Sequence, residues 1–369
     1  MTLAYGVFSH SGGMPRVGAR IDGGVVDLAA ALGDPVFDAP SLNGFLAQGR
    51  AKWREVNDAV NRRTWDTIPL DRVRPHLPFS VGDYVDFYAS EHHASNIGRI
   101  LRPDSPPLAA NWKSLPIAYH GRSGTIILSG TPIARPHGLG RDGAFGPTRR
   151  LDIEAEVGFV VGTGSMWGHP VRPDDIEEHV FGVCLVNDWS ARDIQAFEYV
   201  PLGPFLGKSF ATSISPWIVP LSELRLAKIT PPAQDPLPAG YLRSEDGGWG
   251  LDIRLEIAVN GEVIARPPFS TMYWTPAQML AHMTINGASV RTGDLFASGT
   301  VSGPEPGERG CLMELSWNGQ EPIKLADGST RTFLEDGDEV RISAVAPGPA
   351  GTLIDLGEVT GRILPPVAL

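Results

Sequence analysis

The sequence is poor in cysteine. Only two cysteines, Cys184 and Cys311, occur among 369 residues, which excludes a small fold held together by several disulfides. Cys184 stands in the run Val-Phe-Gly-Val-Cys-Leu-Val, and Cys311 is followed by Leu312 and Met313. Apolar surroundings of this kind are typical of small core residues. We therefore expect both cysteines to be part of the core.

Long apolar runs and an excess of positive charge are also missing. No stretch approaches the roughly 20 apolar residues that span a bilayer, and the amino terminus lacks a charged region followed by an apolar one. We therefore expect a cytoplasmic protein with no membrane partner. With 31 Lys and Arg against 42 Asp and Glu, the formal net charge is -11, which argues against nucleic acid as a partner. An acidic substrate then needs locally concentrated cations, such as Arg102, Arg192 and Lys208.

Three common binding or catalytic motifs are incomplete or missing in this sequence. Gly138, Gly140 and Gly143 have dinucleotide-binding spacing, but a proline-rich loop precedes them and Phe-Gly-Pro follows, so neither the strand nor the helix of that motif is available. The segment 203–209 resembles a phosphate loop but is one residue too short, and Pro204 removes an amide donor. No Gly-x-Ser-x-Gly elbow is present, so a serine hydrolase mechanism lacks its usual landmark.

Glycine and proline, by contrast, are abundant, with 43 and 33 residues. Residues 1–78 read as a small β-rich domain. Asp22-Gly23 between apolar runs predicts a hairpin turn, and a helix is expected over 41–61 with an interruption near Gly49. Two prolines make the segment 74–78 read as a linker. The strands expected in this domain cover 3–9, 16–21 and 25–28.

Residues 79–369 read as a larger domain of short strands separated by many turns. Few helices are expected: one near His93, one over 174–180, one opening at Asp188 and one over 276–283. For the last of these, Thr275 can cap the helix and Pro276 occupies its first turn. The predicted fold class is mainly β with a few helices, an α+β arrangement of a small barrel-like domain and a larger sheet domain.

The segment 151–160 alternates acidic and apolar residues. Alternation places Asp152, Glu154 and Glu156 on one face of a predicted strand. One interpretation is a half-buried strand with a solvated face. The other is a hard divalent cation between the like charges, because carboxylate oxygens suit magnesium or calcium. The sequence has neither the paired cysteines nor the His-Glu-x-x-His helix that favour zinc.

The segment 188–212 carries a second polar pattern. If Asp188 opens a helix, then Arg192, Gln195 and Tyr199 follow along one stripe of its surface, and the loop after it supplies Lys208 and Thr212. This stripe is either an exposed face that meets water or part of a binding site.

A third pattern joins His93 to Glu314. An aromatic strand over 83–88 leads into a short predicted helix that contains His93. Histidine is the side chain best suited to take a proton near neutral pH, although many histidines in such places are structural. Glu314 interrupts an otherwise apolar predicted strand, and a carboxylate that faces a core needs a partner such as His93. The alternative is an edge-strand glutamate that reaches water.

Several longer segments of the sequence resemble the fumarylacetoacetate hydrolase (fumarylacetoacetase) family. They are Asp-Tyr-Val-Asp-Phe-Tyr at 83–88, Leu-Pro-Ile-Ala-Tyr-His-Gly-Arg at 115–122, Asn-Asp-Trp-Ser-Ala-Arg-Asp-Ile-Gln at 187–195, Tyr-Val-Pro-Leu-Gly-Pro-Phe-Leu-Gly-Lys-Ser-Phe at 199–210 and Ala-Ser-Gly-Thr-Val-Ser-Gly-Pro-Glu-Pro at 297–306. The likeness covers nearly the whole chain. It is weakest in the first 78 residues and around 138–149.

The resemblance implies an SH3-like barrel over 1–78, a catalytic domain of mixed β-sandwich and roll type over 79–369, and a homodimer. It implies metal ligands, for Mg²⁺ or Ca²⁺, at Asp86, Glu154, Glu156 and Asp188, with Lys208 and Thr212 tied to a further magnesium site. The implied catalytic set is His93 as the base, Glu314 as its orienting partner, and Arg192, Gln195 and Lys208 around the reacting oxygens. The implied substrate-binding positions are Tyr88, Arg102, Tyr119, Gln195, Tyr199 and Thr300.

The resemblance further implies metal-dependent hydrolysis of a carbon-carbon bond in a small diketo acid, 4-fumarylacetoacetate. The expected products are fumarate and acetoacetate, in the last step of tyrosine and phenylalanine breakdown. Hydrolysis of an acylpyruvate such as fumarylpyruvate, or decarboxylation of a 2-oxo acid, is the alternative on the same fold. A metal-stabilised dimer without catalysis is a further alternative.

Overall fold

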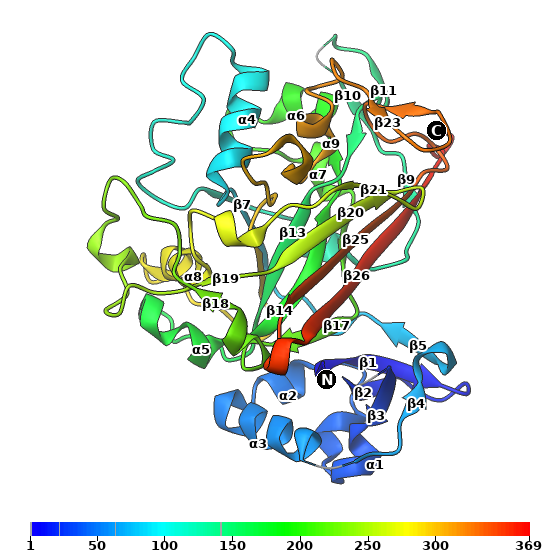
Figure 1. The fold of residues 1–369 in the computed structure, drawn as a ribbon, viewed down its shortest axis with the longest axis vertical. Coiled ribbons are helices and arrows are strands. Elements are labelled where there is room, and N and C mark those ends of the chain that lie inside the picture. Colours follow the sequence, from blue (N-terminus) through cyan, green and yellow to red (C-terminus); the bar gives the residue numbers. More distant parts are fainter. Residues whose placement is uncertain (1, 22, 63, 141) are drawn as a thin grey trace.

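The fold is strand-rich, with short helices between the strands, which confirms the predicted α+β class (Figure 1). The computed structural model describes residues 2–369 except 22, 63 and 141. The predicted turn residue Asp22 therefore lies outside the described residues. The strands on either side of it pair as a hairpin requires, with Ile21 opposite Gly24. No helix in the described part of the chain is long and apolar enough to cross a membrane.

The amino-terminal region is a small antiparallel sheet covered by helices. Gly49 has a φ of 83°, a conformation that favours glycine. The second of two helices begins at Gly49, where one interrupted helix was predicted. The elements are β1 (Ala4–His10), β2 (Arg16–Ile21), β3 (Gly24–Asp27), α1 (Leu28–Leu32), α2 (Asn43–Leu46), α3 (Gly49–Asn61), β4 (Ile68–Pro69) and β5 (Val73–His76).

The predicted linker over 74–78 is wrong for most of its length. Residues 74–76 belong to β5, which pairs with β1 and places Pro75 opposite Phe8. Among the described ladders β5 has only β1 as a neighbour. A proline is tolerated there because an edge strand leaves one side of its backbone without a sheet partner.

Strands from the rest of the chain continue the same sheet. Its hydrogen-bonded order is β4-β3-β2-β1-β17-β14-β13-β22-β6-β7, with β16 beside β14 and β8 beside β16. These further strands are β6 (Tyr84–Phe87), β7 (Ala118–His120), β8 (Ile126–Leu128), β13 (Ala155–Val161), β14 (Val180–Asp188), β16 (Thr212–Ile214), β17 (Trp217–Pro220) and β22 (Leu295–Ala297). Every residue of β13 and β14 is buried, so these two strands form the centre of the molecule.

A second sheet packs on this centre and runs diagonally across the molecule in Figure 1. Side chains of both sheets, such as Leu185, Ile257 and Ile342, belong to one buried cluster. Its order is β21 (Glu262–Ala265), β20 (Arg254–Val259), β25 (Glu339–Pro347), β26 (Leu353–Leu364) and β9 (Ile133–Ala134). Short two-stranded ladders are β10 (His137–Leu139) with β11 (Phe145–Pro147), β12 (Leu151–Asp152) with β15 (Ser190–Ala191), β18 (Lys228–Ile229) with β19 (Gly250–Leu251), and β23 (Ile323–Lys324) with β24 (Thr330–Arg331).

The remaining helices connect these strands. Thr275 caps α8 and forms a capping box with Gln278, as the sequence predicted for this helix. The α-helices are α4 (Glu91–Leu101), α5 (Ile176–His179), α6 (Arg192–Glu198), α7 (Leu206–Ser209), α8 (Pro276–Thr284) and α9 (Leu312–Leu315). The 3₁₀ turns are η1 (Pro35–Asp38), η2 (Leu70–Arg72), η3 (Ser123–Thr125), η4 (Pro173–Asp175), η5 (Glu223–Ala227), η6 (Gly240–Leu242), η7 (Phe269–Thr271), η8 (Pro306–Glu308) and η9 (Pro349–Gly351).

Two predicted element types are wrong. Asp188 does not open a helix: it is the last residue of β14, where it pairs with Thr212 of β16. The strand extends this far because β16 supplies a pairing partner from 24 residues away, which local periodicity does not reveal. Glu314 lies in α9 and not in a strand. Four residues are too few to show a helical period in a sequence.

The amino-terminal region shares a core with the rest of the chain. Phe181 of β14 contacts three of its aromatic rings, with centroids 5.6 Å from Tyr5, 5.7 Å from Phe45 and 5.3 Å from Trp53. Aromatic pairs contribute about 0.5–1.5 kcal/mol each beyond the area they bury. The division at residue 78 stays a prediction, since both the sheet and this core continue across it.

Candidate active site

Sheet register brings three carboxylates onto one face. Glu156 of β13 lies opposite Val186 of β14, and Asp188 is two residues further along that strand. Gly158, two residues after Glu156, lies opposite Ala297 of β22, which in turn pairs with Asp86 of β6. Because side chains alternate along a strand and paired residues share a face, Asp86, Glu156 and Asp188 project from the same side.

Glu154 completes the group. It lies just before β13, where the chain leaves regular pairing, and its carbonyl oxygen accepts the amide of Asp188 at 3.1 Å. Asp86, Glu154, Glu156 and Asp188 are all buried, and each offers an oxygen within 4.8 Å of the others. We call these four residues the acidic cluster.

Asp152 does not share the face predicted for it. Residues 153–154 interrupt the predicted strand, and Asp152 belongs to the separate β12–β15 ladder, where it pairs with Ser190. Its carboxylate accepts the Arg192 guanidinium at 2.8 Å instead of facing the acidic cluster. Alternation cannot survive a break in the strand, which is why the prediction failed at this residue.

Two buried cations lie beside the acidic cluster. The Lys208 ammonium pairs with Glu154, and with Asp188 at 2.6 Å. Arg192 pairs with Glu154 at 2.8 Å. Burial alone would lower the pKa of Lys208, but the charges of Asp188 and Glu154 outweigh it and raise that pKa, so the group stays an ammonium. Burial alone would raise the pKa of Glu154, but Arg192 and Lys208 lower it below the ordinary value.

The acidic cluster is nevertheless short of positive charge. Burial, followed by the neighbouring charge of Asp188, raises the pKa of Asp86 well above its ordinary value. Burial and then the charges of Asp86 and Asp188 do the same for Glu156. Oδ1 of Asp86 and both carboxylate oxygens of Glu156 have no hydrogen-bond partner among the described residues. Buried oxygens are nearly always paired, so these atoms fit a bound hard cation.

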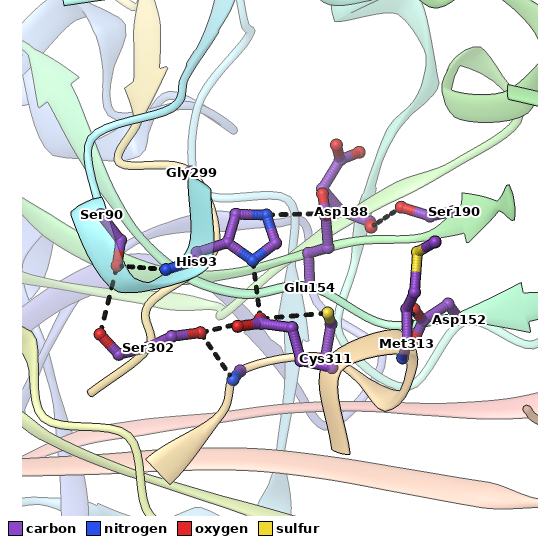
Figure 2. A network of polar contacts seen from close by, with 12 residues as sticks. Ser90, His93, Asp152, Glu154, Asp188, Ser190, Gly299, Ser302, Cys311 and Met313 are labelled. Carbon is purple, nitrogen blue, oxygen red and sulfur yellow. Dashed lines mark hydrogen bonds and ion pairs between the residues drawn. The ribbon is translucent and has the colours of Figure 1, made fainter. Parts of the chain in front are cut away.

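His93 lies next to the acidic cluster (Figure 2). Ser90 caps α4 by accepting the amide of His93 at 3.2 Å, which fixes the residue in the first turn of the helix. The imidazole Nδ1 lies 2.6 Å from Oε2 of Glu314, and Nε2 lies 3.8 Å from Oε1 of Glu154. One ring nitrogen is therefore held by Glu314 while the other faces the acidic cluster.

Glu314 is surrounded by donors. Burial alone would raise its pKa, but His93 and hydrogen bonds from Asn96 and Ser302 lower it below the ordinary value. Asn96 donates at 2.9 Å, Ser302 at 2.8 Å and the Cys311 thiol at 3.3 Å. A carboxylate held in its ionised form only accepts hydrogen bonds. Nδ1 of His93 must therefore carry the hydrogen, so Nε2 is the acceptor nitrogen when the imidazole is neutral.

Arg192 opens α6 and faces inward. Besides Asp152 and Glu154, its guanidinium donates to Gln195 at 3.3 Å. The buried Nη2 has no hydrogen-bond partner among the described residues. A buried guanidinium nitrogen in this state is positioned to donate to a ligand.

The predicted substrate positions differ in their burial and in their contacts with the acidic cluster and His93. The Tyr88 ring packs edge-on against His93 with centroids 5.3 Å apart, and the Tyr119 hydroxyl donates to Asp188 at 2.7 Å. Buried Thr300 has a hydroxyl without a hydrogen-bond partner in the described part of the chain. Two predicted residues lie further out: Arg102 is exposed at the end of α4, and half-buried Tyr199 ends α6.

Cavities flank the site on two sides. One of about 280 Å³ is lined by Tyr119, Asp188, Lys208 and Thr212 among others. Thr212 donates to Asp188 at 3.0 Å at its base. A larger one of about 790 Å³ is lined by Arg192, by β10 and β11, and by residues of α6. His92 lines a different cavity with Glu91 and Ser95, so the two adjacent histidines serve different surroundings.

Sequence reasoning missed several residues that hold the site. Ser90 could have been found, since a serine three residues before His93 at the start of a predicted helix matches a capping position. Asn96 lies three residues after His93 on the same helical face. No local signal pointed to Ser302, whose partner Glu314 is brought to it by the folding of the loop before α9.

Comparisons with known proteins match nearly the whole chain. The family described as "Fumarylacetoacetase N-terminal" matches residues 2–67, and "Fumarylacetoacetate (FAA) hydrolase C-terminal" matches residues 84–364. Fumarylacetoacetase from Arabidopsis thaliana is 43% identical over 98% of this chain and 94% of its own length. The enzyme from Homo sapiens is 42% identical over 98% and 95%. A fumarylacetoacetate hydrolase structure from Exiguobacterium antarcticum covers 99% of this chain and 100% of its own at 18% identity, with a TM-score of 0.60.

Proposed function

The chain belongs to the fumarylacetoacetate hydrolase family, and from this premise we propose that it hydrolyses 4-fumarylacetoacetate to fumarate and acetoacetate. This reaction is the last step of tyrosine and phenylalanine breakdown. One observation carries the proposal best. Unpaired oxygens of Asp86 and Glu156 lie in the same buried site as the hydrogen-bonded pair of His93 and Glu314.

The acidic cluster holds the metal. Carboxylate oxygens are the ligands that Mg²⁺ and Ca²⁺ prefer, and the unpaired atoms of Asp86 and Glu156 fit such an ion. When bound, the ion supplies Lewis-acid polarisation of the substrate's carbonyl oxygens. Lys208 and Thr212 are proposed for a further magnesium site. Their oxygen atoms are the candidates there, because the Lys208 ammonium carries the same sign of charge as the ion.

His93 acts as the base. Its free Nε2 faces the acidic cluster, while Nδ1 is fixed by Glu314. It takes a proton from water, and the resulting hydroxide adds to the fumaryl carbonyl carbon. The bond between that carbon and the neighbouring methylene then breaks. The methylene carbon leaves as the enolate of acetoacetate and receives the proton that His93 took from the water, which completes the two products and restores the base.

Three polar groups stabilise the negative charge that forms on oxygen. Arg192 has a free Nη2, Gln195 contacts Arg192, and Lys208 remains an ammonium. Donors that are already in place cost no reorganisation when the charge develops, and a single such donor contributes about 10²–10³ in kcat. Hydrolysis needs an activated water, so the His93–Glu314 pair favours it over decarboxylation on the same fold.

Substrate-binding residues are proposed on either side of the reacting atoms. Tyr88 packs against His93, and Tyr119 donates to Asp188. Thr300 is buried, and its hydroxyl has no hydrogen-bond partner among the described residues. The substrate has a carboxylate at each end. Arg102, which is exposed after α4, supplies a positive charge for one of these ends, and Tyr199 lies at the end of α6.

We propose a homodimer as the working assembly. Support comes from large apolar side chains that are exposed at the end of α6 and in the segment before α7: Phe197, Val200, Leu202 and Phe205 are 48, 65, 96 and 58% exposed. Patches of this kind are typical of protein interfaces. Two free buried thiols, Cys184 and Cys311, support a cytoplasmic location, and the net charge of -11 opposes nucleic acid binding.

A direct assay tests the activity. Purified protein is supplied with fumarylacetoacetate or fumarylpyruvate, and the loss of diketone absorbance is followed together with release of fumarate. Preference for fumarylacetoacetate, with acetoacetate as the second product, is the expected result. Faster hydrolysis of fumarylpyruvate would overturn the substrate assignment and leave an acylpyruvate hydrolase.

A further inference from the structure

Asp152 is a buried carboxylate that the mechanism above does not use. It is fully buried, and its two oxygens face four donors. Oδ1 accepts the backbone amides of Ile153 at 2.8 Å and Leu312 at 2.7 Å. Oδ2 accepts the Arg192 Nε at 2.8 Å and the backbone amide of Met313 at 3.0 Å. Figure 2 shows Asp152 beside Met313, on the far side of Cys311 from His93.

These bonds connect two parts of the chain that are distant in sequence. The amides of Leu312 and Met313 are the first two of α9, the four-residue helix that carries Glu314. The guanidinium belongs to Arg192, the first residue of α6. Asp152 thus bridges the helix that orients His93 and the arginine that faces the reacting oxygens. Among the described residues, no other side chain forms hydrogen bonds with both Arg192 and amides of α9.

The bridge matters because α9 has only four residues. A helix of one turn is not stable by itself, and its N-cap Cys311 makes no side-chain capping bond. Asp152 therefore takes over the capping of α9 from outside the helix. A shift of α9 would move the Glu314 carboxylate, which lies 2.6 Å from Nδ1 of His93. Loss of the Asp152 contacts would also let the Arg192 guanidinium shift, and its Nη2 donor would move with it.

We propose that Asp152 is a positioning residue for the hydrolysis assigned above, setting Arg192 and, through α9, the His93–Glu314 pair in register with each other. The proposal rests on the proposed function for its kinetic consequences. Its structural part, that Asp152 fixes the environment of His93, is independent of the substrate. Outer-shell partners of metal ligands typically contribute about 10–100-fold to metal affinity or activity, and Asp152 reaches Glu154 of the acidic cluster through Arg192.

The main test compares two isosteric variants, Asp152→Asn and Asp338→Asn. Asp338 is a matched control because it is also buried and also accepts hydrogen bonds from an arginine and from a backbone amide. Unlike Asp152, it lies outside the site. Its partners are Arg331 at 2.9 Å and the amide of Glu335 at 2.8 Å. We expect Asp152→Asn to lower kcat about 10–100-fold, with KM changed less than about threefold and bound metal unchanged. Asp338→Asn should lower thermal stability and leave kcat near the parent value.

Two results would overturn the proposal. One is a kcat for Asp152→Asn no lower than that for Asp338→Asn. The other is loss of metal in parallel with activity, which would place Asp152 with the ion and not with Arg192 and α9. If Asp152→Asn is recovered only unfolded, Asp152→Glu takes its place, because it keeps the charge opposite Arg192 while displacing it by one methylene. The same loss of kcat is expected, and full activity would refute a positioning role.

A double-mutant cycle tests the route through Arg192. If Asp152 acts on Arg192, the loss in Asp152→Asn combined with Arg192→Lys should be smaller than the product of the two single losses. Full multiplication of the two losses would contradict that link.

A last measurement does not use the substrate. The imidazole ¹⁵N resonances of His93, assigned by their disappearance in His93→Gln, should shift in Asp152→Asn and stay in place in Asp338→Asn. Unshifted resonances in both variants would refute the structural part. If the resonances shift in Asp152→Asn but the parent protein fails to hydrolyse fumarylacetoacetate, the structural part is retained and only the proposed function is rejected.

Discussion

The imidazole Nδ1 of His93 lies 2.6 Å from a carboxylate oxygen of Glu314, although the two residues are 221 positions apart in the chain. Glu314 is ionised, so it accepts the Nδ1 hydrogen and leaves Nε2 free to take a proton. Replacement of Glu314 by Gln keeps the size of the side chain but removes the charge that stabilises the protonated imidazole. We expect kcat to fall about 10²–10⁴-fold, with metal content unchanged in elemental analysis. Activity near that of the parent would contradict an orienting role.

His93 itself should be indispensable. His93→Ala removes the base, and we expect the loss of at least about 10²–10⁴-fold in turnover that general base catalysis contributes. Bound metal should be retained, because His93 is not a member of the acidic cluster. The neighbouring variant His92→Ala is the control, since His92 lines a different cavity and should keep full activity. Equal activity of His93→Ala and the parent in the diketone absorbance assay would refute the assignment.

Glu156 should couple metal content to activity. Both of its oxygens lack a hydrogen-bond partner among the described residues, so its main interaction is assigned to the ion. Glu156→Gln removes one ligand charge, and we expect the metal affinity to fall at least about tenfold, with activity falling in parallel as metal is diluted out. Calorimetric titration of the chelator-treated protein measures the affinity. Exposed Glu178→Gln is the control, and unchanged affinity in Glu156→Gln would exclude it as a ligand.

The lowered pKa of Asp338 leads to a prediction of how the free energy of unfolding changes as the pH falls. Burial alone would raise its pKa, but hydrogen bonds from Arg331 and Asn260 lower it below the ordinary value. A carboxyl whose pKa is lower in the folded state contributes stability above its unfolded pKa of about 3.9, and this contribution is lost as pH falls through the folded value. Asp338→Asn should therefore cost about 1–3 kcal/mol near pH 7.

Urea unfolding from pH 7 down to the lowest pH at which both proteins stay folded measures this difference. The gap in the free energy of unfolding between parent and variant should narrow toward the acid end. A gap that stays constant or widens with falling pH would contradict the direction of the shift.

Local signals predicted what local chemistry controls. Thr275 and Pro276 mark the start of α8, because a cap acts on the first residues of its own helix. Gly49 marks the start of α3, because glycine readily adopts a positive φ. The alternation of Glu154 and Glu156 with apolar residues also pointed to the acidic cluster. These features needed no knowledge of distant partners.

Distant pairing decided the rest. Asp188 lies in a strand because Thr212 pairs with it, and Glu314 lies in a helix whose first amides bond to Asp152, 160 residues earlier in the case of Leu312. Asp152, Glu154 and Glu156 follow one another at steps of two residues, yet Asp152 pairs with Arg192 and is not part of the acidic cluster. Sequence spacing gave the candidates, and only the three-dimensional contacts divided them between the acidic cluster and its support. The family resemblance supplied the remaining roles.

The account depends most on a divalent ion held by Asp86, Glu154, Glu156 and Asp188. The most direct measurement is turnover of fumarylacetoacetate by protein stripped with a chelator, with residual metal determined by elemental analysis, during stepwise return of Mg²⁺ or Ca²⁺. The account predicts no turnover without metal and recovery of activity in proportion to occupancy of the site in each chain. Undiminished turnover by protein shown to be metal-free would contradict it.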